Sequence, residues 1–288
     1  MNLFETTTCP TDPYFRALRD EARFSDMRRH VEELWGRFSP YADPSFISEI
    51  ARSFLARYWE MYLGCSLLDL NFDLRRNLGT GPDFDASGPD YRVLLEAVSV
   101  GPGVGDDAVP SQLFGGSEAQ VTPTTQIILR ICSAILDKRR QHARHTEAAL
   151  IPPDIPFVVA VHLGGITNAE TNSVVPLSVS ACLGVKTVLY PVGGGESAAP
   201  IAIPHSSVLK SSGAEIDARL FLQSESIDVS GLLLSSVHPF SIPSEGGGYE
   251  FLHNPQAGSP VRRGWFKKGI EYWVEDGRLL KADHDSGS

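Results

Sequence analysis

Hydrophobic residues recur at every third or fourth position along three long stretches of the chain, and this spacing predicts amphipathic helices. The stretches are residues 14–38, 45–70 and 124–144. Between the first two, Ser39-Pro40 and Asp43-Pro44 interrupt the pattern, because proline cannot continue a helix. The N-terminal part of the chain is therefore expected to be helical.

Shorter apolar or alternating runs predict strands. Two of them, residues 93–100 and 156–163, are almost continuously apolar, which is typical of strands covered on both faces of a sheet. Residues 174–183 fit either a helix or a strand. The other strands are predicted at residues 71–78, 83–86, 186–192, 230–237, 249–253, 272–274 and 279–280. This order predicts an α/β fold with a mixed central sheet flanked by helices and a C-terminal β-rich extension.

The chain has 288 residues, of which 42% are hydrophobic, and this is enough for one large domain with a substantial core. Residues 1–44 are expected to form an N-terminal helical segment, and residues 45–165 the core of the domain. Residues 166–288 are expected to form the C-terminal β-rich extension of the same domain.

One acidic residue, Glu96, lies in the middle of the apolar run 93–100. A buried carboxylate without a partner is costly, so such a residue is normally paired, protonated or bound to a metal. Upstream, Asp83 follows Gly-Pro, and the turn-forming residues 87–90 separate it from the apolar run. We expect a hairpin that brings Asp83 close to Glu96, and a Glu96 pKa that burial and Asp83 raise. Two carboxylates on adjacent strands supply the oxygen ligands that Mg²⁺ or Mn²⁺ prefers.

The Pro-Asp pair at Asp83, the hairpin turn and the apolar strand with Glu96 resemble the PD-(D/E)xK nuclease superfamily, also called the restriction-endonuclease-like fold. Asp83 matches the motif aspartate and Glu96 the motif (D/E), whereas Val98 stands where the family has its lysine. The predicted order of a helix, three strands, a helix and a strand over residues 45–163 is also that of the family's core. The chain therefore resembles a bacterial branch of this superfamily that lacks the strand lysine.

The resemblance implies roles for two residues on helices. Glu60 looks like the glutamate with which the first core helix of the family often completes the metal site; an ion pair with Arg57 is the alternative. In some members the catalytic lysine has moved to the helix after the strand, and Lys138 is the candidate here because it continues the apolar row of its helix. The alternative is a lysine that reaches solvent and pairs with Asp137 or Glu147.

Composition changes this picture only slightly. The net charge of −10 argues against a protein that coats nucleic acid non-specifically. No apolar run approaches the roughly 20 residues needed to cross a bilayer, and the N-terminus lacks a basic segment followed by an apolar one. We expect no membrane association and a cytoplasmic location, because four scattered cysteines favour free thiols in a reducing compartment. They are Cys9, Cys65, Cys132 and Cys182.

The resemblance implies a metal-dependent nuclease that hydrolyses phosphodiester bonds in DNA or RNA. Asp83, Glu96 and Glu60 would hold Mg²⁺ or Mn²⁺, and Lys138 would be a further catalytic residue. A second hypothesis is a catalytically inactive binding or scaffold protein that keeps the fold, which Val98 and the acidic balance favour. A third is an unrelated β-rich binding protein, in which a buried arginine would pair with Glu96. The sequence motifs of serine hydrolases, HExxH zinc proteases and dinucleotide-binding loops are absent.

Overall fold

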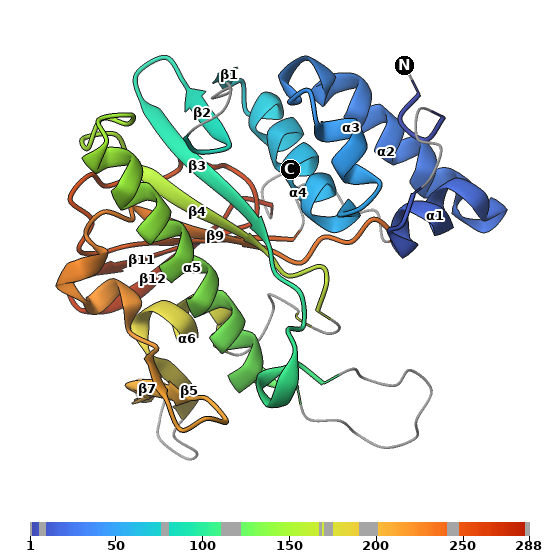
Figure 1. The fold of residues 1–288 in the computed structure, drawn as a ribbon. Coiled ribbons are helices and arrows are strands. Elements are labelled where there is room, and N and C mark those ends of the chain that lie inside the picture. The colour runs from blue at the N-terminus through green and yellow to red at the C-terminus, as the bar shows by residue number, and fades with distance from the viewer. Residues whose placement is uncertain are drawn as a thin grey trace.

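The computed structural model describes residues 2–5, 10–75, 81–110, 122–166, 169, 175–189, 201–240 and 248–285. An eight-stranded mixed sheet forms its centre, and helices cover both faces of that sheet (Figure 1). The predicted α/β class, with a mixed sheet, flanking helices and additional C-terminal strands, is confirmed. Among the described residues, no helix is both long enough and apolar enough to cross a membrane.

The N-terminal part is helical, as predicted, but its helices are shorter than the periodicity indicates. The predicted helix over residues 14–38 is two helices, because Glu21 adopts an extended backbone between them. The apolar spacing is the same on both sides of this break and so could not reveal it. The four helices are α1 (Pro13–Asp20), α2 (Ser25–Phe38), α3 (Phe46–Ile50) and α4 (Phe54–Asp69).

The predicted helix over residues 45–70 is also broken, and here the cause is a tertiary contact. The backbone N–H groups of Thr11 and Asp12 both donate to the carbonyl of Ala51, and Phe54 donates its N–H to the Asp12 carboxylate at 3.0 Å. Asp12 also caps α1 by accepting from Tyr14 and Phe15. One aspartate therefore fixes the start of two helices that are far apart in the sequence.

The central sheet has the strand order β1-β2-β3-β4-β9-β10-β11-β12. The pairs β3–β4, β4–β9 and β10–β11 are parallel, and the remaining pairs are antiparallel. The last four strands thus belong to the same sheet as the first four. The strands are β1 (Asp73–Arg75), β2 (Phe84–Ser87), β3 (Arg92–Ser99), β4 (Phe157–His162), β9 (Gly231–Ser235), β10 (Tyr249–His253), β11 (Ile270–Glu275) and β12 (Arg278–Asp283).

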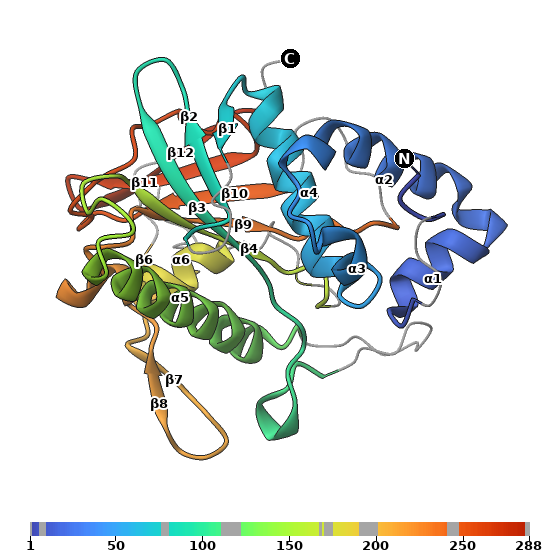
Figure 2. The same cartoon turned by 45° about the horizontal axis from the view of Figure 1, so that its top comes forward.

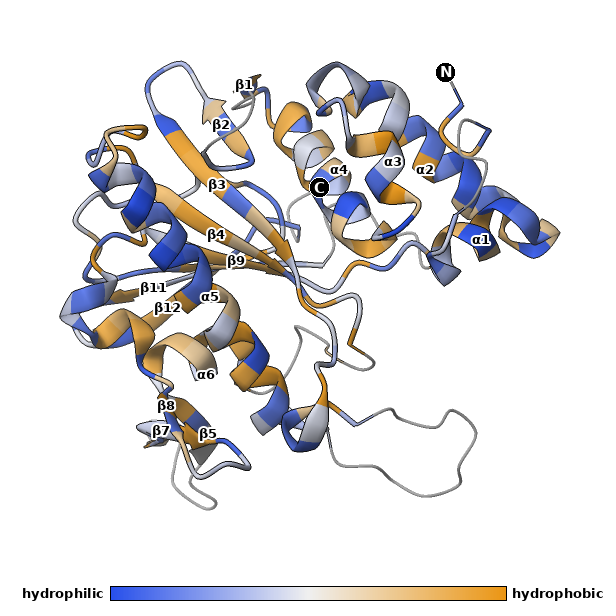
Figure 3. Ribbon diagram, in the orientation of Figure 1, coloured by the Kyte–Doolittle hydropathy of each residue, from blue (hydrophilic) through white to orange (hydrophobic). Residues whose placement is uncertain are grey.

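Each face of the sheet carries its own hydrophobic core. Helix α4 lies over one face, and α5 (Thr124–Glu147) with α6 (Leu177–Leu183) lies over the other (Figure 2). Along β3, Val93 and Leu95 belong to the core under α4, whereas Leu94 belongs to the core under α5. The inner strands β4 and β9 are hydrophobic over most of their length (Figure 3), as expected for strands covered on both faces.

The structure also decides the local predictions for the remaining segments. The helix predicted over residues 124–144 is α5, and residues 174–183, which fit either structure, contain the helix α6. The strand predicted at residues 186–192 corresponds to β5 (Val185–Leu189), which pairs with β6 (Ile201–Pro204) outside the central sheet. A second small sheet pairs β7 (Ser207–Leu209) with β8 (Glu215–Asp217). Residues 76–78 and 190–192 of the predicted strands lie outside the described residues.

Candidate functional site

The hairpin formed by β2 and β3 places Asp83 beside the middle of β3. Its strands are antiparallel, and Phe84 is the partner of Leu95. Asp83 directly precedes Phe84, so one more step of the same register sets it opposite Glu96. Asp83 Oδ2 accepts a hydrogen bond of 2.8 Å from the backbone N–H of Ala97. The aspartate is therefore held at the end of the hairpin, against the strand that carries the glutamate.

Glu96 is only 5% exposed and faces α5. Lys138 of this helix donates from Nζ to Glu96 Oε1 at 2.7 Å and to Gln141 Oε1 at 3.3 Å. The predicted position of the Lys138 ammonium, next to a site carboxylate, is confirmed. Asp137, its alternative partner, pairs with Arg140 instead. The described residues thus supply a lysine to Glu96, whereas the third hypothesis requires a buried arginine.

The electrostatics of Glu96 follow from this arrangement. Burial, followed by the negative charge of Asp83, raises the pKa of its carboxyl group from 4.5 to about 7, as predicted. The Lys138 ammonium and a hydrogen bond from the Asp83 backbone lower this pKa, but they do not outweigh burial. Two carboxylates therefore lie close enough to repel each other, and one lysine does not fully compensate for them.

Val98 lies two residues after Glu96, on the same face of β3. Its side chain is half-buried and packs against the core under α5. A lysine at this position would approach Glu96 along the strand, whereas Lys138 approaches from the helix that covers the same face. A cation thus reaches Glu96 from a neighbouring helix, while position 98 of β3 is apolar.

Glu60 lies on α4 and is 5% exposed. It forms an ion pair with Arg57, which also pairs with Asp43 at 3.4 Å. One turn later, a Cβ atom at Gly64 would lie 3.3 Å from the ring of Phe84, the neighbour of Asp83, so α4 approaches β2 closely there. Glu60 is therefore on the turn of α4 that precedes this contact, and its pairing with Arg57 is the alternative that the sequence offered.

The described residues contain no group of three or more histidine, cysteine, aspartate or glutamate side chains that could hold a metal ion. The structure brings together Asp83, Glu96 and Lys138, but it does not form the three-carboxylate set with Glu60. Mg²⁺ is usually bound through one or two carboxylates, with water and substrate phosphates completing its shell. The two repelling carboxylates fit this kind of site, since a cation would relieve the repulsion.

Gln141 is a member of this cluster that the sequence analysis missed. The signal was available, because residues three apart on a helix are neighbours and Gln141 is three residues after Lys138. A second polar contact lies at the other end of β3 and β4, where Ser99 Oγ is 2.9 Å from His162 Nδ1 and His162 Nε2 is 2.6 Å from the Val237 carbonyl. His162 is fully buried and stacks on Trp59, so this contact joins strands rather than facing a ligand.

The fold and this site together define an α/β protein with a carboxylate pair and a lysine on one face of a mixed sheet. Compared with known proteins, the chain matches no family model, no curated protein and no solved structure.

Proposed function

We propose that the chain is a metal-dependent nuclease of the PD-(D/E)xK type, whose lysine comes from α5 instead of β3. The contact of 2.7 Å between Lys138 Nζ and Glu96 Oε1, beside Asp83, is the observation that carries the proposal. It supports the proposal because the same three chemical groups, two carboxylates and an ammonium, are those of the family motif. The substrate would be DNA or RNA.

In this proposal Asp83 and Glu96 hold Mg²⁺ or Mn²⁺, whereas Glu60 is not among the ligands, because it lies on α4, which covers the other face of the sheet. A bound divalent ion supplies Lewis acidity and lowers the pKa of water that it binds. The chain's own residues position the reacting groups: the Asp83 carboxylate is fixed by Ala97, and Glu96 is fixed by Lys138. Lys138 also supplies a positive charge that stabilises the negative charge developing on a phosphate.

A second candidate function is a binding or scaffold protein without catalysis. Val98 at the position of the family's lysine and the net charge of −10 favour it. Under this hypothesis Lys138 only neutralises Glu96, and the pair stabilises the packing of α5 on β3. The two hypotheses differ in whether the carboxylates bind a divalent metal and whether nucleic acid is cleaved.

The test is cleavage of a panel of single- and double-stranded DNA and RNA with Mg²⁺ or Mn²⁺, together with Mn²⁺ binding by calorimetry. We expect metal-dependent cleavage by the unaltered protein, and loss of Mn²⁺ binding in Asp83→Asn and Glu96→Gln. Asp137→Asn, an exposed carboxylate on α5, is the matched control. A protein that binds no Mn²⁺ and cleaves nothing would contradict the nuclease proposal and favour the scaffold.

We also place the protein in the cytoplasm, as a reducing compartment. The three described cysteines, Cys65, Cys132 and Cys182, are free and buried, which supports this location because the fold does not use them in disulfides.

A further inference from the structure

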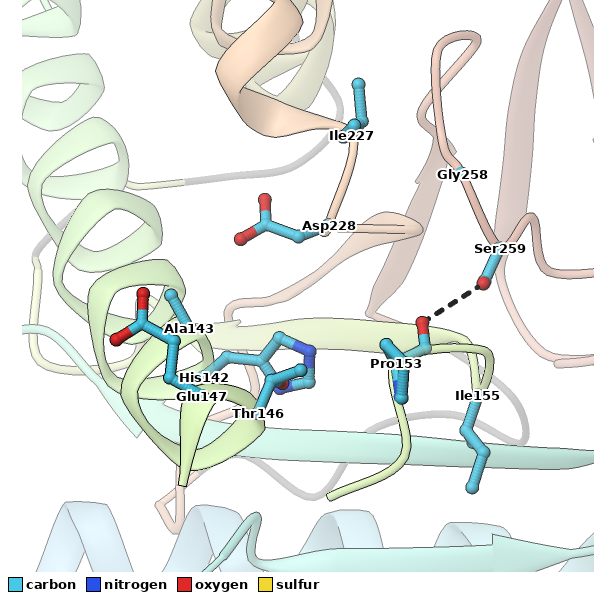
Figure 4. A pocket seen from close by; sticks show the side chains of 10 residues that line it. All are labelled: His142, Ala143, Thr146, Glu147, Pro153, Ile155, Ile227, Asp228, Gly258 and Ser259. Atoms are coloured by element: carbon cyan, nitrogen blue, oxygen red, sulfur yellow. Dashed lines mark hydrogen bonds between the residues drawn. The ribbon is translucent and has the colours of Figure 1, made fainter. Parts of the chain in front are cut away.

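A cavity of about 450 Å³ lies beside the C-terminal half of α5. Its walls come from α5, from residues 153–155 just before β4, from Ile227 and Asp228 before β9, and from Gly258 and Ser259 after β10 (Figure 4). Ligand-binding cavities in proteins are typically about 300–1,000 Å³, so this one is large enough for a small flat molecule. Of the lining residues, the sequence analysis named only Glu147, as a possible partner of Lys138, because the lining comes from four separate segments.

Three side chains of the cavity wall carry a buried polar atom without a hydrogen-bond partner among the described residues. The atoms are His142 Nδ1, Thr146 Oγ1 and Asp228 Oδ1. Arg139 Nε lies 3.3 Å from Asp228 Oδ1, but the pair lacks the alignment of a hydrogen bond. Native proteins pair nearly all their buried polar groups, so three such atoms around one cavity indicate a molecule that supplies their partners.

The walls also indicate the chemistry of this molecule. The lining includes the carboxylates of Asp228 and Glu147, and Arg139, which is not in the lining, pairs with Asp228, so the walls themselves offer no cation to a phosphate. Burial lowers the pKa of His142 to about 4, and its imidazole is therefore neutral at neutral pH. The remaining walls include the apolar side chains of Ile155 and Ile227. A flat, uncharged heterocycle with N–H donors for a carboxylate, and with acceptors beside them, fits these walls.

The cavity lies close to the carboxylate–lysine site by two independent paths. Along α5, His142 is four residues after Lys138, which is about 6 Å of helix. Across the sheet, the His142 ring stacks on Phe157 at 3.9 Å, and Phe157 is the partner of Leu94, two residues before Glu96. Two strand residues span about 7 Å. The offset between the two sites, whether taken along the helix or along the strands, is thus comparable with the span of one nucleotide.

We propose that this cavity binds an unpaired guanine base next to the phosphodiester bond that is cleaved. The inference rests on the proposed nuclease function. Guanine combines N–H donors with the O6 and N7 acceptors on one flat ring system, and it matches a carboxylate beside a hydroxyl and a neutral imidazole. The base must leave its stack to enter, so the preferred substrate is single-stranded.

The first experiment measures nucleoside binding without metal, by calorimetry with guanosine, adenosine, cytidine and uridine. We expect guanosine to bind tighter than the other three by about tenfold or more, the scale of one bidentate contact. Asp228→Asn and Thr146→Val should lose this preference, whereas Asp137→Asn on the exposed side of α5 should keep it. Asp228→Asn keeps the shape of the side chain, and thermal unfolding monitors whether each variant is folded.

The second experiment maps cleavage positions on a single-stranded oligonucleotide of random sequence. The unaltered protein should cleave beside guanine, and Asp228→Asn should cleave without base preference. Cleavage without base preference by the unaltered protein, with no nucleoside bound, would overturn the guanine site and leave the nuclease intact. Equal binding of all four nucleosides that Asp228→Asn does not change would also overturn it and show a water-filled cavity only. Guanosine binding by a protein that cleaves nothing would support the cavity and contradict the nuclease.

Discussion

Removal of the ammonium group of Lys138 tests most directly whether this lysine takes the place of the strand lysine. We expect Lys138→Ala to reduce Mn²⁺-dependent cleavage by about 10²- to 10³-fold, the scale of losing one donor that stabilises charge in a transition state. The assay is single-turnover cleavage of a labelled oligonucleotide, which reports the chemical step. Lys281→Ala removes an exposed lysine on β12 and is the matched control, with no change expected.

The same change should cost little stability, and the structure gives the reason. Breaking a fully buried ion pair typically costs about 3–5 kcal/mol, because it leaves an uncompensated charge. Glu96, however, has a pKa of about 7, so near neutral pH it takes up a proton at little cost. The Lys138 side chain is also 22% exposed and partly solvated before the change. We therefore expect Lys138→Ala to lower the free energy of unfolding by about 1–2 kcal/mol at pH 7.

A second variant separates the charge of Lys138 from its packing. Val98 lies on the same face of β3 as Glu96, where the family has its lysine, so Lys138→Ala combined with Val98→Lys returns a cation to the same carboxylate. We expect the double variant to regain at least about tenfold of the lost cleavage, since a charge donor is restored. A folded Lys138→Ala protein with full activity would refute the role of this lysine. A double variant that cleaves no faster than Lys138→Ala would show that only a lysine on α5 can support cleavage.

Three further predictions concern the fold. Burial raises the pKa of Glu250 to about 7 from its ordinary value of 4.5, so between these pH values the native state binds more protons than the unfolded state. The free energy of unfolding should therefore fall as the pH rises through this window. Glu250→Gln should remove up to about 3 kcal/mol of this fall, measured by urea unfolding from pH 4 to 8. A Cβ atom at Gly64 would lie 2.5 Å from the Phe38 ring, so Gly64→Ala should lower the free energy of unfolding by about 1–3 kcal/mol. A Cβ atom at Gly36 of α2 would have nothing within 4 Å, so Gly36→Ala should raise the free energy of unfolding by about 0.5–1 kcal/mol. A destabilised Gly36→Ala protein would contradict this geometry. Asp12→Ala should cost about 1–2 kcal/mol, because it removes the cap of α1 and the contact with the start of α4, and an unchanged thermal midpoint would refute this role.

The sequence predicts the strands of the central sheet well where burial imposes a clear pattern. The continuous apolar runs correspond to β3 and β4, which have helices on both faces, and the run of β10 matches its predicted ends. The order of the strands in the sheet could not be predicted in the same way, because it depends on which strands pair with each other. No local pattern places β9 directly beside β4, although their pairing is among the parallel contacts that hold the sheet together.

Helix boundaries are where the prediction fails, and the failures have a common physical cause. Both breaks in the N-terminal helices preserve the apolar spacing, so the periodicity predicts one continuous helix in each case. At Ala51 the break is stabilised by backbone donors of Thr11 and Asp12, which come from a distant part of the chain. Such a contact depends on the packing of α1 against α4 and cannot be seen in a window of neighbouring residues.

The candidate site shows the same division. Asp83 and Glu96 could be paired from the sequence, because a short hairpin joins them and its register follows from its turn. The lysine could be placed because helix spacing sets Lys138 in the row that faces β3. The cavity beside α5 could not be predicted, since His142 and Asp228 meet only after β4 and β9 have paired. Side chains that one hairpin or one helix brings together can be predicted from the sequence. Side chains that meet only through the pairing of distant strands cannot.

The location of the cation on α5 also explains why Val98 and Lys138 belong together. A lysine on each element would place two ammonium groups against two carboxylates, and the site would then be electrically balanced without a metal. With one lysine, the repulsion between Asp83 and Glu96 persists, and after burial it is the second cause of the raised pKa of Glu96. The apolar residue at position 98 therefore adds no positive charge to the site, and it packs against the core under α5. Under the proposed function, a divalent cation would supply the missing positive charge without adding bulk to the packed face of the sheet.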